Sequence, residues 1–434
     1  MALNVIQDGA AVADPIRVNA SEERGVLRFI TAGSVDDGKS TLIGRLLHDT
    51  CALADDQLAA LERVSSKRGH EGVDLSLLTD GLEAEREQGI TIDVAYRYFV
   101  TPKRKFIIAD TPGHEQYTRN MVTGASTADA AVVLIDARKG VLPQTRRHTC
   151  IAHLLGVRTI IVAVNKMDLV GYDYEVFKEI QARFLAFAEP LGITKLRFIP
   201  VSALRSDMVV VRGTGIDWYD GPTLLEALEA IDPNEEDADA PLRFPVQLVV
   251  RPGHGSDFRG YAGRLESGVL VRGATVLALP SGARSIVRDI VTLEGSRTVA
   301  VAGDPVTLLL ADDIDLSRGD MLADPARPPR VTKTIDAALC WLATEPLQPS
   351  GRYLLKQTTR TVRAKIAAIE DVLDIHSLAR NKAPATLATN DIARVSISLQ
   401  QPICVDPYQT NRATGAFILI DEATHQTVAA GMIR

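Results

Sequence analysis

The sequence predicts an α/β domain with a mostly parallel sheet, followed by two all-β barrel domains. Between Val26 and Ile231, short apolar runs alternate with amphipathic stretches of helical periodicity, which is typical of βαβ units. After residue 241, helical periodicity disappears, and runs of alternating apolar and polar residues are separated by Gly-rich turns. Two proline-containing stretches, 232–241 and 324–330, are expected to link the three regions.

Length and composition agree with three folded domains. The chain has 434 residues, of which 46% are apolar and 24% charged, as is ordinary for a globular protein. We expect residues 1–23 to form a flexible N-terminal tail, 24–233 the α/β domain, 242–326 the second domain and 331–434 the third.

Composition also argues against several classes of protein. The net charge of −7 argues against a large nucleic-acid footprint, which needs clustered Lys and Arg. The cysteines contain no C-x-x-C pair, so neither a zinc site nor a disulfide framework is indicated. No apolar run reaches the roughly 18 residues of a membrane-spanning helix, and the N-terminus lacks the pattern of a signal peptide. A cytoplasmic protein with no membrane partner is therefore expected.

Five strands are expected in the first domain, each followed at once by a polar or Gly-containing segment. They are Val26–Ala32, Phe106–Ala109, Ala131–Ile135, Thr159–Val164 and Phe198–Val201. Open α/β sheets bind ligands at the carboxyl ends of their strands, so these segments predict a ligand site.

The barrel domains show strand patterns at several places. The second domain has them at Arg243–Val250, Ala274–Leu279 and Val306–Leu310. The third has them at Leu339–Leu342, Arg394–Ser398, Phe417–Ile420 and Thr427–Ile433.

A phosphate-binding loop follows the first strand. Residues 33–40 match the pattern G-x-x-x-x-G-K-S and lie between a predicted strand and a predicted helix, which is the context that a P-loop requires. Backbone N–H groups would cradle the phosphates, Lys39 would pair with the β and γ oxygens, and the Ser40 hydroxyl would ligate magnesium. The residues expected to bind here are Gly33, Ser34, Val35, Asp36, Asp37, Gly38, Lys39, Ser40 and Thr41.

The second strand ends in a loop suited to the γ-phosphate, formed by Asp110, Thr111, Pro112, Gly113 and His114. Asp110 would hold magnesium through water, and the Gly113 N–H would sense the γ-phosphate. A neutral His114 would orient the attacking water, although a lone loop histidine is more often simply solvated. Its place directly after Asp-x-x-Gly favours the catalytic role.

Guanine specificity is expected from the fourth strand's end, at Asn165, Lys166, Met167 and Asp168. A carboxylate there accepts from both the N1–H and the exocyclic amine of guanine, and adenine offers neither donor. Ser202, Ala203 and Leu204 follow the fifth strand and are expected to cap the guanine O6. Taken alone, that serine could equally be a helix N-cap.

A switch segment is expected between the P-loop and the second strand, at residues 85–92. Thr91 would complete the magnesium coordination when the γ-phosphate is present. The predicted metal ligands are therefore Ser40, Thr91 and, through water, Asp110, and the predicted catalytic residues are His114, Thr91 and Lys39.

Together these motifs resemble the translational GTPase superfamily, whose elongation-factor-like architecture places two β-barrels after the nucleotide domain. Within it, four segments resemble the GTP-binding large subunits of bacterial sulfate adenylyltransferase (ATP sulfurylase). They are residues 79–96, 114–121, 136–141 and 257–263, of which the last lies outside the nucleotide domain. Translation factors usually carry a histidine in the P-loop where this chain has Ser34 or Asp37, which also favours the sulfate family.

The resemblance implies a GTP- and Mg²⁺-dependent GTPase that works with a small adenylyltransferase subunit, in a heterodimer or a higher assembly. The small subunit would make adenosine 5′-phosphosulfate and pyrophosphate from ATP and sulfate, and GTP hydrolysis would drive that synthesis, the first step of sulfate assimilation. The resemblance also implies an apolar gate of Val35 and Ile90 beside His114. Some relatives carry a fused adenylylsulfate kinase with a second P-loop, which this sequence lacks.

Three alternatives remain open at this point. A factor that delivers aminoacyl-tRNA would find its best support in Lys356, Arg360, Arg363 and Lys365, which we expect to form one solvated strand face. A non-hydrolysing GTP-dependent scaffold would not need Thr91 and His114. An ATP-dependent kinase conflicts with residues 165–168.

Overall fold

The computed structural model describes residues 25–50, 52, 75, 93–114, 117–232, 239–251, 258–348, 350–374, 379–382 and 384–434. The predicted tail and the predicted switch segment at residues 85–92 lie outside these ranges. No helix in the described part of the chain combines the length and the apolar character that crossing a membrane requires.

A six-stranded sheet forms the core of the first domain, in the order β2-β3-β1-β4-β5-β6. The strands are β1 (Val26–Ala32), β2 (Ala95–Val100), β3 (Lys105–Asp110), β4 (Ala130–Asp136), β5 (Thr159–Asn165) and β6 (Leu196–Pro200). All neighbouring pairs are parallel except β2 and β3, which are antiparallel. Every residue of β4 is buried, as expected of a strand covered on both faces.

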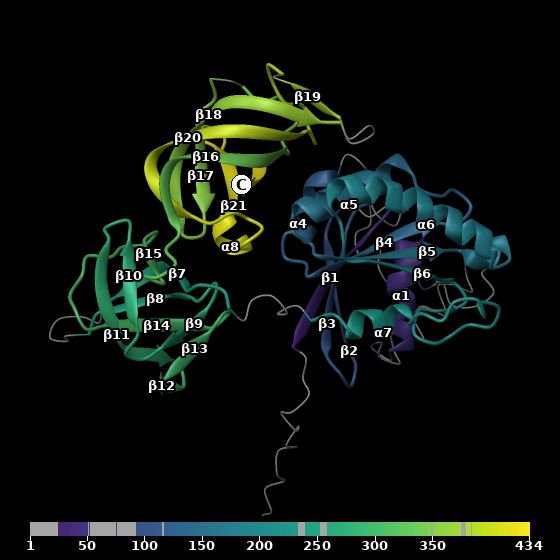
Figure 1. The fold of residues 1–434 in the computed structure, drawn as a ribbon, viewed down its shortest axis with the longest axis horizontal. Coiled ribbons are helices and arrows are strands. Elements are labelled where there is room, and N and C mark those ends of the chain that lie inside the picture. The colour runs from purple at the N-terminus through teal and green to yellow at the C-terminus, as the bar shows by residue number, and fades with distance from the viewer. Residues whose placement is uncertain are drawn as a thin grey trace, which may run out of the picture.

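Helices cover both faces of this sheet (Figure 1). Helices α4, α5 and α6 pack on one face, and α1 and α7 pack on the other. Their bounds are α1 (Lys39–Asp49), α4 (Thr118–Ala125), α5 (Pro143–Leu154), α6 (Tyr174–Ala188) and α7 (Leu224–Glu229), with short 3-10 turns η3 (Met167–Val170) and η4 (Glu189–Leu191). Asp173 caps α6, and Thr223 and Glu226 form a capping box on α7.

The second domain is a closed antiparallel barrel. Its strands run in the order β10-β15-β7-β8-β14-β11-β12, and pairing of β10 with β11 closes the sheet. The bounds are β7 (Arg243–Val250), β8 (Gly260–Arg264), β10 (Thr275–Leu279), β11 (Ala283–Thr292), β12 (Gly295–Arg297), β14 (Pro305–Leu310) and β15 (Met321–Ala323), and a separate ribbon pairs β9 (Val269–Val271) with β13 (Val299–Val301).

The third domain is a second barrel, in the order β17-β21-β22-β16-β20-β18-β19, closed by pairing of β17 with β18. The bounds are β16 (Arg330–Trp341), β17 (Tyr353–Gln357), β18 (Arg360–Leu373), β19 (Arg380–Lys382), β20 (Ile392–Val405), β21 (Ala416–Asp421) and β22 (Thr427–Ile433), with the short helix α8 (Arg412–Gly415) before β21. These sheets confirm the predicted fold class.

The three domains contact one another. Arg243 of the second domain makes a bidentate ion pair with Asp406 of the third, with N–O distances of 2.8 and 2.9 Å. The third domain also meets the loop after α5, where the Tyr408 hydroxyl donates to the carbonyl of Leu155 at 2.5 Å. Arg412 donates to the same carbonyl at 2.6 Å and to that of Ala128 at 3.1 Å.

Several details of the predicted organisation were wrong. The sheet has a sixth strand, β2, that was not predicted. It lies at the edge of the sheet with Tyr96 and Tyr98 exposed, so no buried apolar run marks it in the sequence. Arg330, expected in the second linker, already belongs to β16. The predicted domain bounds stay predictions.

The four basic residues expected on one solvated strand face occupy two strands and two faces. Lys356 lies on β17 and the other three lie on β18. Lys356, Arg363 and Lys365 are exposed, and the strand register puts them on one face. Arg360 is half-buried on the opposite face, where its guanidinium lies 3.2 Å from the Asp320 carboxylate.

Candidate nucleotide site

Four of the predicted segments meet at the carboxyl edge of the first sheet. Strands β1, β3, β5 and β6 run in one direction, so the loops that follow them emerge at the same edge. The P-loop after β1 contacts the loop after β5 through a hydrogen bond from Asn165 to the carbonyl of Asp37, at 2.8 Å. The loop after β5 in turn contacts the loop after β6, because the Ala203 N–H donates to Asn165 Oδ1 at 3.0 Å.

The P-loop backbone requires glycine at position 38. Gly38 has a φ of 93°, in the left-handed region, and a Cβ there would lie 2.4 Å from Asn165 Nδ2. Ser34 is held from inside the loop, since its N–H donates to Asp37 Oδ2 at 2.6 Å. The Asp37 side chain is buried, and burial raises the pKa of its carboxyl. The hydrogen bond from the Ser34 N–H lets the Asp37 side chain shape the loop.

Lys39 places a cation across the mouth of this loop. Its side-chain amine donates to the carbonyls of Gly33 at 3.2 Å and Ser34 at 2.9 Å. Only 7% of the residue is exposed, and burial lowers the pKa of the amine against the opposing charges of Asp110 and Asp37. A buried cation held mainly by neutral carbonyls is well suited to receive an anionic phosphate chain.

A buried histidine supports the loop from α5. The Gly33 N–H donates to His148 Nδ1 at 3.3 Å, and the other ring nitrogen, Nε2, lies 2.8 Å from the Gln144 side-chain amide nitrogen. His148 is fully buried, and burial, with Lys39 and Arg147 nearby, lowers its pKa to about 3. The imidazole is therefore neutral at physiological pH.

An ion pair and a backbone hydrogen bond of Lys166 hold the loop after β5 in place. Lys166 adopts a φ of 62°, donates to the carbonyl of Asp36, and lies 3.0 Å from Asp136 Oδ2. Burial opposes ionisation of Asp136, but hydrogen bonds from Arg138 and Lys166 outweigh it and hold the pKa of this carboxyl well below its usual range. Asp136 thus stays anionic and anchors the lysine that lies over the P-loop.

Asp168, the carboxylate predicted to select the base, is held by contacts with the loop after β6. The Ser202 hydroxyl donates to Asp168 Oδ1 at 2.7 Å, while Arg205 lies 3.9 Å from Oδ2. Ser202 is buried, Ala203 is buried, and Leu204 is 68% exposed. Arg45 of α1 fixes this segment, donating to the carbonyls of Ala203 at 3.1 Å and Leu204 at 2.7 Å.

The loop after β3 comes close to Lys39. A Cβ on Gly113 would lie 2.5 Å from the Lys39 amine, so only glycine permits this approach. Asp110 is buried, and its Oδ1 accepts from the Thr31 hydroxyl at 3.2 Å. The Thr111 hydroxyl donates to the carbonyl of Thr31 at 2.6 Å, which ties this side chain to β1.

His114 is exposed at the end of the described part of this loop, with its ring 6.2 Å from that of Tyr117. Thr91 and Ile90 lie outside the described residues, and Val35 is half-buried in the P-loop. The magnesium ligand set is therefore described only for Ser40 and Asp110, whose hydroxyl and carboxylate oxygens are donors that Mg²⁺ prefers.

Sequence reasoning missed His148, Arg45 and Asp136. Their roles depend on contacts between residues that are more than 25 positions apart in the chain, such as Arg45 with Ala203. A signal was present for Asp136 alone, since the charged residues Asp136, Arg138 and Lys139 directly follow a predicted strand.

Family models match most of the chain. The model described as "Elongation factor Tu GTP binding domain" matches residues 24–234, and the model "GTP-eEF1A C-terminal domain-like" matches residues 334–434. These matches cover the P-loop sheet and the third domain, in agreement with the elongation-factor-like architecture.

Among similar proteins, "Sulfate adenylyltransferase subunit 1" of Alteromonas mediterranea is 52% identical over 95% of this chain and 87% of its own length. The protein of the same name from Aeromonas hydrophila is 53% identical, over 96% and 87%. The "Bifunctional enzyme CysN/CysC" of Mycobacterium tuberculosis is 52% identical over 94% of this chain and 67% of its own length.

Proposed function

Since this chain belongs to the sulfate adenylyltransferase subunit 1 family, we propose that it is the GTPase subunit that drives synthesis of adenosine 5′-phosphosulfate and pyrophosphate by a separate small catalytic subunit. The family assignment rests on 52–53% identity over nearly the whole chain. The observation that carries the GTPase part is the convergence of Lys39, Asp168 and Gly113 at one sheet edge.

The phosphates and the guanine base of GTP would each contact side chains that the fold already holds in place. Lys39 and the P-loop amides would hold the β- and γ-phosphates, because the buried ammonium is already directed across the loop. Asp168 would accept from the N1–H and the amine of guanine, and the Ser202 hydroxyl keeps that carboxylate from rotating. Asn165 links the two halves of the site.

We further propose that Ser40 and Thr91 ligate Mg²⁺ directly and that Asp110 holds it through water. When bound, the ion would neutralise charge that develops on the β and γ oxygens. The protein's part is to orient the ligands, and the hydrogen bond from Thr31 holds the Asp110 carboxylate toward the P-loop end of the sheet.

His114 is our candidate for orienting the attacking water. It follows Gly113, whose amide would contact the γ-phosphate, so its imidazole is one residue from the reacting centre. We expect His114→Ala to bind GTP normally and to lose about a hundredfold or more of stimulated hydrolysis. Unchanged stimulated hydrolysis would assign the water to another group.

Coupling to the small subunit requires that the two proteins contact each other differently in the two nucleotide states. A γ-phosphate biases a partner only through such differential contacts. We therefore propose that the partner touches the segment 85–92, the loop at 110–114, or the barrels that follow. Cytoplasmic location is part of the proposal, supported by Cys150, Cys340 and Cys404, which are buried free thiols.

The experiment is to measure GTP hydrolysis by this chain alone and with its candidate small subunit, ATP and sulfate, while adenosine 5′-phosphosulfate is quantified in parallel. GTP-dependent product formation with stimulated hydrolysis would support the proposal. Stimulation by ribosomes, with no effect of the small subunit, would assign the chain to translation and leave only GTP hydrolysis standing.

A further inference from the structure

The edge strand β2 carries a stripe of exposed apolar side chains. Tyr96, Tyr98 and Val100 occupy alternate positions, so all three point to the same face of the sheet. Their exposed fractions are 41%, 65% and 60%. Phe99, which lies between two of them, points to the opposite face, where it is buried and stacks on Phe106. The strand is therefore anchored on one face and presents an apolar stripe on the other.

Strand pairing extends the face beyond the stripe. Ile107 of β3 pairs with Tyr98 on one side and with Arg28 of β1 on the other, so these three side chains form one row across the sheet. Lys105 of β3 pairs with Val100 in a neighbouring row. Ile107 is half-buried, whereas Arg28 and Lys105 are exposed. This β2–β3 face therefore has an apolar centre with two cations at its border.

Both strands of the face lead to loops of the nucleotide site. Strand β3 runs directly into the loop at 110–114, whose Gly113 lies close to the Lys39 amine. Ala95, the first residue of β2, pairs with Asp110, and β2 begins three residues after the predicted switch segment 85–92. A protein on the β2–β3 face is therefore placed next to loops that we expect to respond to the γ-phosphate.

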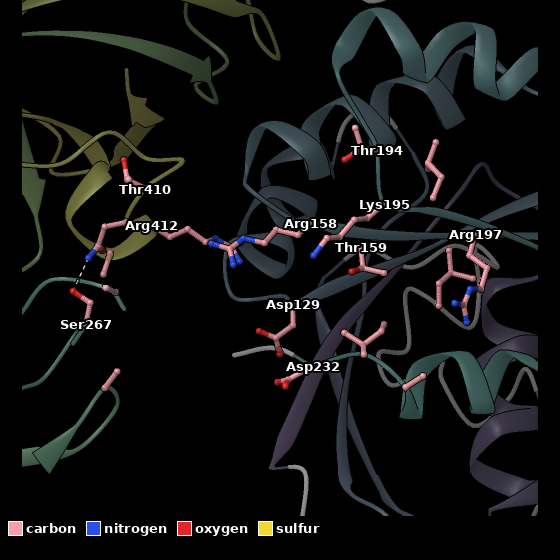
Figure 2. Close-up of a pocket in the computed structure, with 18 of the residues that line it drawn as sticks. Asp129, Arg158, Thr159, Thr194, Lys195, Arg197, Asp232, Ser267, Thr410 and Arg412 are labelled. Carbon is pink, nitrogen blue, oxygen red and sulfur yellow. Dashed lines mark hydrogen bonds between the residues drawn. The ribbon is translucent and has the colours of Figure 1, made fainter. Parts of the chain in front are cut away.

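At its β1 border, the face reaches the junction of the domains. The backbone N–H of Arg28 donates to Asp129 Oδ2 at 2.8 Å. Figure 2 shows Asp129 at the wall of a cavity of about 500 Å³ that is lined by all three domains. Asp129 offsets part of the charge of Arg28, and Lys105 adds a second cation to the face. A partner that covers the face is thus also close to the two barrels.

Area and charge together argue against a second copy of this chain as the occupant. The stripe exposes roughly a few hundred Å² of apolar surface, which is as large as the largest patch on many monomers. A stable complex buries about 800 Å² on each partner, so the stripe is large enough for the centre of an interface only. A symmetric contact of two copies through this face would also bring two sets of Arg28 and Lys105 together.

We propose that the small adenylyltransferase subunit docks on the β2–β3 face, with an apolar surface against the stripe and acidic side chains against Arg28 and Lys105. The inference rests on the proposed function, which supplies this partner. Tyrosine is enriched among the residues that carry most of the binding energy of interfaces, because it buries a large area and loses little conformational entropy. Docking beside the nucleotide loops gives the partner contacts that change with the γ-phosphate.

The second domain has another exposed apolar surface, on the ribbon of β9 and β13. Its outward side chains form two cross-strand pairs of valines, which are Val269 with Val301 and Val271 with Val299. Neither strand of this ribbon leads to a nucleotide loop, so docking there gives no direct contact with the γ-phosphate. The ribbon therefore serves as the matched comparison.

The test is interferometry of the full chain, with GDP or a non-hydrolysable GTP analogue bound, on the immobilised small subunit. Tyr98→Glu/Val100→Glu should bind at least tenfold more weakly and keep its GDP affinity, because the stripe lies outside the nucleotide loops. Stimulated GTP hydrolysis should be lost at low concentrations of small subunit and restored at high ones. Lys105→Glu should weaken binding at low salt and have less effect at high salt.

The control Val269→Glu/Val299→Glu introduces the same charge on the ribbon and should leave binding unchanged. Equal affinity of the stripe variant and the unmodified protein would overturn the inference while leaving the proposed function intact. Loss of binding in the ribbon variant alone would move the partner to the second domain and overturn it too. Dimers of this chain alone that the stripe variant abolishes would assign the stripe to a second copy. If the unmodified protein does not bind the small subunit, the proposed function itself fails, and this inference with it.

Discussion

At the scale of single residues, base recognition depends on the orientation of one carboxylate. Asp168 is 5% exposed at its side chain and is held by the Ser202 hydroxyl. We predict that Asp168→Asn weakens GTP binding by about tenfold to a hundredfold and favours xanthosine triphosphate, because the amide would donate to the oxygen that replaces the guanine amine. Competition binding with both nucleotides measures this.

The control for that prediction is Ser202→Ala, which removes the orienting hydroxyl but keeps the carboxylate. It should weaken GTP binding less than Asp168→Asn does and should not change the preference for guanine. Equal GTP affinity in Asp168→Asn and the unmodified protein would refute the role of Asp168.

The buried His148 makes a prediction about pH. Its pKa is about 3 in the folded protein and 6.5 in the unfolded chain, so the unfolded state binds more protons between these values. The contribution of His148 to the free energy of unfolding is present in full above pH 6.5. It decreases as pH falls and is about 2 kcal/mol smaller at pH 5. The glutamine of His148→Gln still accepts from the Gly33 N–H but does not titrate. Between pH 7 and pH 5 the free energy of unfolding of this variant should therefore fall by about 2 kcal/mol less than that of the unmodified protein.

Urea unfolding at the two pH values, compared between the unmodified protein and the variant, tests this. The comparison cancels the other histidines, which both proteins share. An identical pH dependence in the two proteins would mean that His148 is protonated or accessible in the folded state.

Individual ligands of the site were predictable where a motif carries them. Lys39 and Asp168 follow strands at fixed offsets within short motifs, so local sequence was enough. The partners that hold them were not predictable, because the bonds from Ser202 to Asp168 and from Arg45 to Leu204 join segments that only the folded sheet brings together.

At the scale of elements, the loops after the strands set the spacing of the site. The loop after β3 passes so close to the P-loop that a Gly113→Ala methyl group would displace the Lys39 amine, a mobile side-chain end. We predict that this variant folds with nearly unchanged stability and binds GTP at least tenfold more weakly, since a charge-assisted contact to phosphate is lost. Fluorescent nucleotide binding and thermal unfolding, measured together, test both parts.

A large loss of stability in Gly113→Ala would show that the Gly33 carbonyl, 3.1 Å from the added Cβ, cannot adjust. Normal GTP affinity would show instead that Lys39 reaches the phosphates by another route.

Strands buried on both faces were predictable to within two residues, and so were the barrel strands β7, β14 and β22, whereas the two longest strands were not. The predicted run Val26–Ala32 matches β1, because a mostly apolar run, interrupted here only by Arg28 and Thr31, marks a strand covered on both sides. In the third domain, β18 and β20 extend over 14 residues each and contain register shifts against each other, so their alternation breaks and only part of β20 was recognised.

At the scale of the whole molecule, the two barrels are joined by a buried ion pair. Arg243 is 2% exposed and Asp406 13% at their side chains. We predict that Arg243→Ala costs about 3–5 kcal/mol of unfolding free energy, because it leaves the carboxylate buried without its cation. The midpoint and slope of urea unfolding measure the loss.

Arg363→Ala is the matched control within the third domain. Arg363 pairs with Glu422 but is 65% exposed at its side chain, so its loss should change stability by less than about 1 kcal/mol. Similar effects of the two substitutions would mean that the Arg243 pair does not behave as a buried one.

The contact between the first and third domains has a consequence for how the protein can diverge. Tyr408 and Arg412 donate to the carbonyl oxygens of Leu155 and Ala128, which belong to the main chain and are present whatever residue stands there. Random mutagenesis should therefore find loss-of-contact alleles on the barrel side and few on the other. Suppressors of a barrel-side defect should likewise arise at the barrel, so the two surfaces need not covary.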